Sequence, residues 1–382
     1  MGVVVPDKVK FGRRVTCKYE ELEPMERAAL FHPTQLYREI VACLNRGERV
    51  AQGIIVARFG SGPREAGVSM IALEDGRTLG TVGGGALEAK VTEMAGRVLR
   101  EQSPVCQTFS LAGQRVEDGG MICGGDVEIL VDFLDAADPI CHRIFEQILR
   151  DQEARRPSWL VRSMRREGSG CVVRTGLGLL DDEGFDMGSL DMSGVDPDAL
   201  AEKHRKPEAI LISAGDIRYV VQPVDYPETV FLFGAGHIAR ELAPICGVLG
   251  FKVVVIDDRS ELANAERFPT VSELLITGSY EESFARPDID ASAYIVIVTH
   301  SHAHDKTVLS LSLKTSAAYI GMIASSRKRE IIFRSLADEG ASEDDLARVH
   351  SPIGLEIGAR TPAEIAVSIA AELIAVRSRR IS

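Results

Sequence analysis

The sequence predicts an α/β protein in which a C-terminal domain built on a parallel sheet follows an N-terminal α+β domain. After residue 229, five short apolar runs alternate with helical segments, which is typical of a parallel sheet buried on both faces. Before residue 225, strand-like runs, hairpin turns and separate helical stretches alternate. The segment 222–228, QPVDYPE, has two prolines between apolar strands and is interpreted as a linker, so the predicted domains are 1–225 and 229–382.

The N-terminal domain is expected to begin with a helix over 36–47, whose apolar residues have helical spacing and which Gly47 ends. Three strands follow, the last after an Asp75-Gly76 turn, and then a helix that a triple glycine opens. Two strands around a glycine-rich loop occupy 105–134, and a helix comes next. The region 158–222 is predicted as strands and hairpins, interrupted over 181–198 by a solvated loop with seven acids and no base.

The C-terminal domain is expected to contain five buried strands. These are TVFLF at 229–233, FKVVVID at 251–257, ELLIT at 273–277, AYIVIVT at 293–299 and AAYIGMI at 317–323. Its last helix is predicted to begin at a capping box of Thr361 and Glu364 around Pro362.

Composition excludes several classes of partner. The 382 residues include 44 basic and 56 acidic side chains, and the net charge of -12 argues against binding to nucleic acid or anionic lipid. Seven cysteines without a Cys-x-x-Cys pair form neither a disulfide framework nor a zinc site. The first residues show no signal core, and the longest apolar stretch, Ile365 to Val376, is short and contains Glu372. We therefore expect a cytoplasmic protein.

A glycine turn is the strongest local motif. Gly234-Ala235-Gly236-His237 follows a strand and opens a helix, and Asp257 and Asp258 end the next strand, as in the dinucleotide-binding fingerprint. The pattern predicts a Rossmann-like fold with cofactor contacts at Gly234, Gly236, His237, Asp257 and Asp258, because backbone N–H groups at a helix start bind phosphate. A Rossmann-like domain that binds no dinucleotide is the alternative.

Histidines follow the fourth C-terminal strand. His300, His302 and His304 alternate within Thr299–Asp305, at the edge where open sheets bind ligands. If a helix begins near Ala303 the side chains diverge and no distant ligand set is evident, so we assign no metal site. We expect His300 and His302 to contact a ligand, and plain loop histidines are the alternative.

Two further groups of residues suit an anionic ligand. Arg327, Lys328 and Arg329 lie at a predicted helix start, where cations oppose the helix dipole unless an anion binds, although a solvated basic patch is the alternative. In the first domain the turn Gly83-Gly84-Gly85 offers backbone N–H groups to an anion, and Arg64 offers a fork of donors.

Cys123 is the candidate thiol, because flexible glycines follow it and let another group approach. A small buried cysteine without a chemical role is the alternative.

The ordered motifs resemble the XdhC/CoxI family of xanthine dehydrogenase accessory factors over most of the chain. The resembling blocks are GSGPREAG at 60–67, DGRTLGTVGGGALE at 75–88, CGGDVEIL at 123–130, FGAGHIA at 233–239, VIDDR at 255–259, VTHSHAHD at 298–305, AAYIGMIASSRKR at 317–329 and HSPIGLEIGARTPAEIAVSI at 350–369. Many CoxI-type relatives have Ser-Gly-Gly-Cys where this chain has Gly83-Gly84-Gly85-Ala86. A thiol at position 86 is therefore absent, which leaves Cys123.

The resemblance implies a cofactor chaperone rather than an enzyme. It implies that the protein binds the molybdenum cofactor, assists its sulfuration and inserts it into apo xanthine dehydrogenase or a related molybdenum hydroxylase, with a cysteine desulfurase as a further partner and a homodimer as the assembly. We expect the cofactor phosphate near the Gly234–Gly236 turn or Arg327 and the metal end near Cys123, in a cleft between the domains.

Two other functions remain open at this point. An NAD(P)-dependent oxidoreductase would use Asp257 to bind the ribose hydroxyls and His300 or His302 as the acid-base group. A scaffold that binds only the hydroxylase would bind neither ligand.

Overall fold

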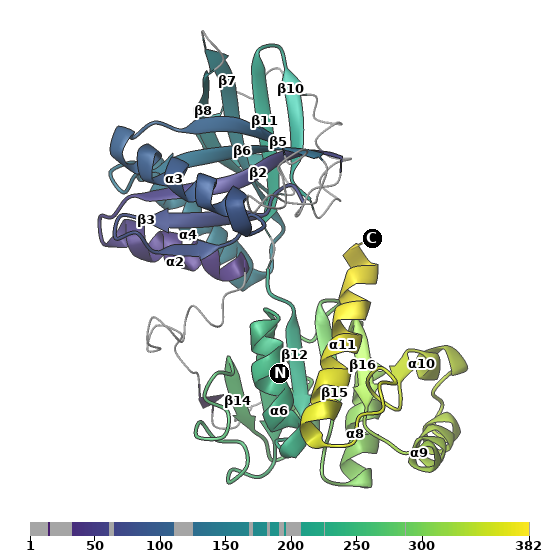
Figure 1. The fold of residues 1–382 in the computed structure, drawn as a ribbon. Helices are drawn as coiled ribbons and strands as arrows, with labels where there is room; N and C mark the ends of the chain where they lie inside the picture. The colour runs from purple at the N-terminus through teal and green to yellow at the C-terminus, as the bar shows by residue number, and fades with distance from the viewer. Residues whose placement is uncertain are drawn as a thin grey trace, which may run out of the picture. The chain divides into compact units, whose positions relative to one another are not determined.

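The computed structural model describes residues 14–15, 33–60, 65–110, 125–167, 171–181, 184–190, 195, 208–224, 226–286 and 288–381. The chain divides into two compact units (Figure 1). One unit is Phe31–Tyr226, and the other is Pro227–Ser382 together with the start of the chain.

The C-terminal unit contains the predicted Rossmann-like domain. Its sheet has the order β1-β14-β13-β12-β15-β16-β17, and all pairs are parallel except β1 with β14. The strands are β1 (Arg14–Val15), β12 (Thr229–Phe233), β13 (Lys252–Asp257), β14 (Glu273–Ile276), β15 (Ala293–Ile297), β16 (Tyr319–Met322) and β17 (Val349–His350). The helices are α6 (His237–Val248), α7 (Tyr280–Ser283), α8 (His302–Ser312), α9 (Ser326–Asp338), α10 (Glu343–Ala347) and α11 (Pro362–Ile381).

Both faces of this sheet are covered, which explains the continuous apolar runs in its strands. Val230 and Leu232 of β12 pack under α6 and α11, whereas Phe231 and Phe233 point to the opposite face, where α8 and α9 lie. Figure 1 shows α6 and α11 side by side on their face. The predicted fold class is therefore confirmed.

Helix α11 also has the predicted start and an internal polar anchor. The Glu364 amide donates to Thr361 Oγ1 at 3.3 Å, and the Thr361 amide donates to Glu364 Oε2 at 2.9 Å, so the capping box is present. Further along the helix, Glu372 accepts hydrogen bonds from Tyr319 Oη at 2.5 Å and Gly354 N at 2.8 Å, and pairs with His350 Nδ1 at 2.9 Å.

The N-terminal unit has two five-stranded antiparallel sheets. Their orders are β4-β3-β2-β6-β5 and β10-β11-β7-β8-β9. The strands are β2 (Val50–Gly60), β3 (Ser69–Leu73), β4 (Thr78–Gly80), β5 (Val105–Ser110), β6 (Gly125–Leu134), β7 (Ser158–Glu167), β8 (Cys171–Asp181), β9 (Gly184–Gly188), β10 (Ile210–Ala214) and β11 (Ile217–Val224). The helices are α2 (Pro33–Asn45), α3 (Gly85–Glu101) and α4 (Pro139–Ala154).

Helix α3 covers one face of the first sheet, and the other face of that sheet packs on β7 and β11 of the second. Between them lies a charged pair: Arg162 Nε is 3.0 Å from Asp132 Oδ2, and both side chains are fully buried. The guanidinium also donates to Gln52 at 2.6 Å and Gln222 at 3.2 Å, which compensates for part of its desolvation.

The N-terminal unit contains an edge strand where the sequence predicts a loop. The loop expected over 181–198 is wrong for Gly184–Gly188, which form β9 and pair with β8. Phe185 and Met187 alternate with polar residues within the acidic run, and Met187 packs against the core beneath α2 and α4. This short alternation is sufficient for an edge strand despite the surrounding charge.

Candidate functional site

The predicted C-terminal site residues meet at one edge of the parallel sheet. The Gly234–Gly236 turn follows β12, Asp257 ends β13 and Asp258 follows it, His300 follows β15, and Arg327 follows β16. The carboxyl ends of parallel strands lie on the same side of a sheet, so the topology brings these segments together.

Gly234 and Gly236 of the turn have different surroundings. Gly234 has φ +116°, and a Cβ there would lie 2.4 Å from the carbonyl oxygen of Val298, so this glycine allows close packing against the segment that follows β15. Gly236 has φ -74° and open space around its Cβ position. Only the second glycine therefore faces space that a ligand could use.

Gly236 also begins an uncapped helix. It is the N-cap of α6, whose first residue is His237, and no side chain among the described residues caps that helix. The neighbouring helices are capped by their own serines: Ser301 Oγ accepts from His304 N at 3.1 Å, and Ser325 Oγ accepts from Lys328 N at 3.3 Å. Of these three helix starts, that of α6 is the one that remains open to an anion.

Asp257 is fully buried and holds the turn in place. Its carboxylate accepts from Ala235 N at 2.6 Å, from Arg259 N at 2.9 Å and from Arg259 Nε at 2.8 Å. Burial acts to raise the pKa of Asp257, but the Arg259 side chain and the two backbone donors outweigh it and lower the pKa below its usual range. The carboxylate is thus used within the protein, so the expected contact with ribose hydroxyls, and with it the NAD(P) alternative, has no support.

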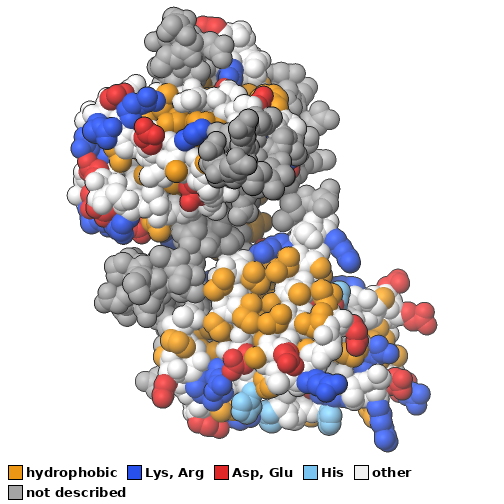
Figure 2. Space-filling model, viewed as in Figure 1, with side chains coloured by type: hydrophobic (Ala, Val, Ile, Leu, Met, Phe, Trp, Pro, Cys, Tyr) orange, Lys and Arg blue, Asp and Glu red, His pale blue; other side chains and the backbone are white. Residues whose placement is uncertain are grey.

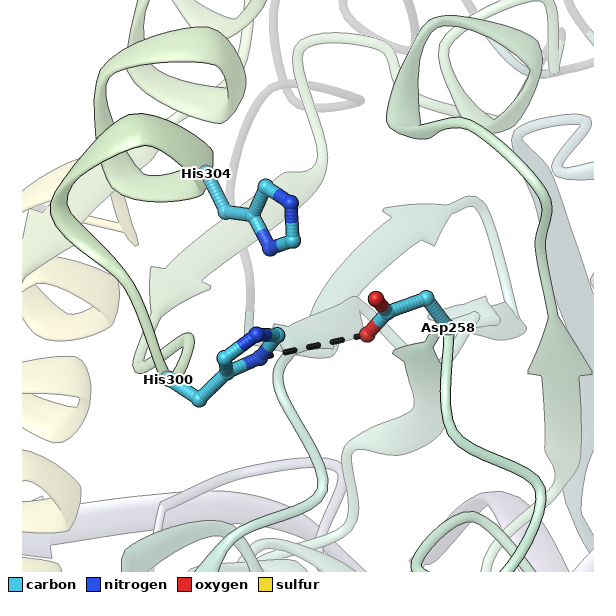
Figure 3. Close-up of side chains that lie close together, drawn as sticks. All are labelled: Asp258, His300 and His304. Atoms are coloured by element: carbon cyan, nitrogen blue, oxygen red, sulfur yellow. Dashed lines mark ion pairs between the residues drawn. The ribbon is translucent and has the colours of Figure 1, made fainter.

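Asp258, the next residue, lies instead beside two histidines. Figure 3 shows Asp258, His300 and His304 facing a common space. Their candidate ligand atoms all lie within 4.8 Å of one another, and His300 Nδ1 is 3.9 Å from Asp258 Oδ1. No distant partner of the histidines was evident from the sequence; in the structure Asp258, which directly follows β13, lies beside them. His302 is exposed and does not belong to this group.

The basic run after β16 is mostly used for structure. Lys328 forms an ion pair with the fully buried Asp305, and Arg329 donates to the carbonyl oxygen of Ser351 at 2.9 Å. Arg327 is exposed and makes no hydrogen bond or ion pair with another residue that the structure describes. The anion site predicted for this run is reduced to Arg327.

In the N-terminal unit the triple glycine is filled by the protein itself. Gly83, Gly84 and Gly85 all have positive φ, but Gly83 N donates to Thr81 Oγ1 and Gly84 N donates to Glu88 Oε2, each at 3.1 Å. A carboxylate in this position repels an anion, so the anion site expected at this turn is not available. The sequence holds the signal: Glu88 lies in the first turn of α3, where an acid complements the helix dipole.

Arg64 and Cys123 lie outside the described residues, but the residues that flank their segments are informative. Gly60 ends β2, Gly125 begins β6, and the two are register partners. The neighbouring pair is Ser110 of β5 with Asp126 of β6. Gly60, Ser110 and Gly125 therefore lie at the same end of one sheet.

The fold and site define a two-domain protein with an α+β unit and a Rossmann domain whose sheet edge contains an open helix start. The model of the XdhC Rossmann domain matches residues 230–373, and the model of the XdhC and CoxI family matches residues 43–110. The chain belongs to the XdhC and CoxI family.

Relatives match along most of the chain. It is 26% identical to the uncharacterized protein YqeB of Escherichia coli over 86% of its length, but it spans only 43% of the length of YqeB. It is 26% identical to a probable xanthine dehydrogenase subunit of Bacillus subtilis, covering 88% of this chain and 96% of that protein. It is 22% identical to the molybdenum cofactor insertion chaperone PaoD of Escherichia coli, covering 90% of this chain and 88% of PaoD.

A solved structure has the same fold. The crystal structure of a xanthine dehydrogenase from Bacillus halodurans superimposes with a TM-score of 0.69 at 25% identity and covers 90% of this chain and 96% of that one. None of the helices in the described part of the chain combines the length and apolar character that a membrane span requires.

Proposed function

We propose that this protein binds the molybdenum cofactor, holds it during sulfuration in the cytoplasm and delivers it to a molybdenum hydroxylase of the xanthine dehydrogenase type. The observation that supports this function most directly is the match to PaoD, a molybdenum cofactor insertion chaperone, over 90% of the chain. A match of that extent includes both units. The cofactor is the cargo of the protein, and we propose no catalytic residue.

The open start of α6 is the proposed phosphate site. The molybdenum cofactor has a terminal phosphate, and a helix start with free N–H groups and a positive dipole end stabilises such a group. Gly236 leaves room for it, His237 is the first residue of the helix, and Arg327 supplies an exposed cation at the same sheet edge. These three residues are the core of the proposed cofactor contacts in the C-terminal unit.

The N-terminal unit is proposed to contact the metal end of the cofactor. Molybdenum bound to dithiolene sulfur accepts soft ligands, for which a thiolate is suited. Cys123 is the proposed thiol and Arg64 the proposed cation; both lie outside the described residues, and we propose them from the sequence motifs that contain them. The Gly83–Gly85 turn is not part of the proposed site, because Thr81 and Glu88 accept the N–H groups of Gly83 and Gly84 and the Glu88 carboxylate repels an anion.

The test is co-purification of the tagged, full-length protein from molybdenum-replete cells, followed by molybdenum and pterin analysis. We expect the wild type to carry both molybdenum and pterin, and Cys123→Ala to lose the sulfurated form. Cys106→Ala is the matched control, since Cys106 is a partly exposed thiol of the same unit whose Sγ lies 3.5 Å from Glu128 Oε1. Absence of molybdenum and pterin from the wild-type protein would refute the function, and equal retention by Cys123→Ala would refute only the role of that thiol.

We further propose that the client is an apo hydroxylase, that a cysteine desulfurase supplies the sulfur, and that the protein is a homodimer. The dimer is supported by an exposed apolar strip, which we define as Val248, Leu355, Val367 and Ile374. Apolar side chains gather over α6 and α11 (Figure 2). Val367 and Ile374 lie seven residues apart and therefore on one face of α11, and such a strip suits a self-complementary two-fold contact.

A further inference from the structure

We infer that Asp258, His300 and His304 form a binding site for one divalent transition-metal ion of the zinc class. The inference is independent of the proposed function, because it rests on these three side chains alone. They come from the end of β13, from the segment after β15 and from the first turn of α8, and Figure 3 shows them around one space.

The distances fit a shared ion better than direct contact. His300 Nδ1 and Asp258 Oδ1 are 3.9 Å apart, which is too long for a hydrogen bond. Two ligands about 2.0–2.1 Å from a tetrahedral zinc ion lie about 3.3 Å from each other. All three ligand atoms lie within 4.8 Å of one another, so small rotations suffice. Asp258 and His300 can make them, since their side chains are 34% and 38% exposed.

His304 is the fixed ligand of the group. Its Nδ1 is buried and has no hydrogen-bond partner in the part of the chain that the structure describes, although an unpaired buried polar atom is costly. The ring packs edge-on against Tyr280, with centroids 5.3 Å apart, and against His300 at 4.8 Å. A metal ion bound at Nδ1 would supply the missing partner to a ring whose orientation is already set by its neighbours.

Tyr280 is a second unsatisfied group beside the cluster. This residue is 4% exposed, and its hydroxyl has no hydrogen-bond partner among the described residues. A phenolic hydroxyl in this position can donate to a water or an anion held at the metal.

The donor set selects the class of ion. Two imidazoles and one carboxylate suit Zn²⁺ and its neighbours in the first transition row, whereas Mg²⁺ and Ca²⁺ prefer oxygen ligands only. Arg259 Nε lies 3.7 Å from Asp258 Oδ1, but this cation is already paired with Asp257 at 2.8 Å. The local positive charge is thereby compensated and does not exclude an added cation.

Three protein ligands leave a fourth position open. Asp258 follows β13 and His300 follows β15, and β12 lies between these two strands in the sheet. The Gly234–Gly236 turn follows β12. The open position is therefore on the same sheet edge as the uncapped start of α6. Its expected occupant is water or the oxygen of an anion bound at that helix start.

The test is calorimetric titration of ZnCl₂ into chelator-treated, full-length protein. We expect one equivalent to bind to the wild type, and an affinity at least about tenfold lower in Asp258→Asn and in His300→Ala, because even changes outside the ligand shell cost about 10–100-fold. His302→Ala is the matched control, an exposed histidine at the start of α8 outside the cluster, and it should retain wild-type affinity. Co²⁺ should give a visible absorption band in the wild type that both ligand variants lose.

Asp258 and His300 are exposed, so these variants should fold, and circular dichroism verifies this. Absence of a saturable equivalent in the wild type overturns the inference. So does an affinity that is unchanged in both ligand variants, or that falls equally in His302→Ala. Since the titration contains no molybdenum cofactor, its result is separate from the outcome for the proposed function.

Discussion

The substitution Gly236→Asp separates ligand binding at α6 from the stability of the fold. Gly236 has φ -74° and no atom of a described residue within 4 Å of its Cβ position, so a side chain fits there without strain. Aspartate is a better N-cap than glycine by roughly a few tenths of a kcal/mol, and we expect the free energy of unfolding to stay equal or rise slightly. The same carboxylate would occupy the proposed phosphate position.

The expected loss of cofactor is large. Two unit charges 4 Å apart repel by about 4 kcal/mol at an effective dielectric constant of about 20, and rotation of the side chain reduces this value. We therefore expect at least a tenfold loss of cofactor affinity, roughly 1.4 kcal/mol or more. The assay is pterin and molybdenum content after purification, together with urea unfolding.

Gly236→Ala is the matched control, since it adds a side chain without charge. Gly234→Ala supplies the contrast, because its Cβ would meet Val298 O at 2.4 Å and should destabilise the domain itself. Normal cofactor content in a stable Gly236→Asp protein would refute the placement of the phosphate at this helix start.

Three other substitutions test the core, the C-terminal helix and the assembly. Arg162→Met should lower the free energy of unfolding in urea by about 3–5 kcal/mol, because the buried Asp132 loses its charge partner. The double variant Arg162→Met with Asp132→Leu should recover most of that stability. A loss under about 1 kcal/mol in the single variant would contradict the argument. Burial acts to raise the pKa of Glu372, but hydrogen bonds to His350, Tyr319 and Gly354 lower it below its usual range. This carboxylate therefore stabilises the folded state at neutral pH and loses that effect as the pH falls through its folded pKa. The Tm of Glu372→Gln should thus be lower than that of the wild type at neutral pH, and the two values should converge in acid. A difference in Tm that does not depend on pH would contradict the assignment. Val367→Glu should convert the dimer to monomers, which light scattering measures as a halved mass. Ile331→Glu is the control, because Ile331 is an exposed apolar residue of α9 outside the strip. An unchanged mass in Val367→Glu would exclude the apolar strip as the dimer contact.

The fold could be predicted further than the site. Apolar runs report burial on both faces of a sheet directly, so the parallel strands and the capping box of α11 could be inferred from the sequence. The pairing of β1 with β14 could not, because two residues far along the chain from their partner leave no periodic pattern. The edge strand β9 was hidden by the acids around it.

Site prediction failed where the protein satisfies its own polar groups. A glycine turn shows which backbone N–H groups are free to point outward, but not whether a side chain reaches them first. Glu88 accepts a hydrogen bond from Gly84 N in the Gly83–Gly85 turn, whereas no described side chain caps α6 at Gly236. The first turn differs in having Glu88 four residues after Gly84. An acid at such a position can be recognised in a sequence once its effect on the turn is known.

The consecutive acids at the end of β13 show the same principle within two residues. Side chains alternate in direction along a strand, so Asp257 points into the protein and Asp258 can face solvent. The inner carboxylate fixes the glycine turn through Ala235 N and is neutralised by Arg259, while the outer one is left to approach His300. In a dinucleotide-binding domain the acid at this position is free for the ribose. Here it is consumed by the turn, so the ligand chemistry of this edge depends on the open helix start and on Asp258 with its two histidines.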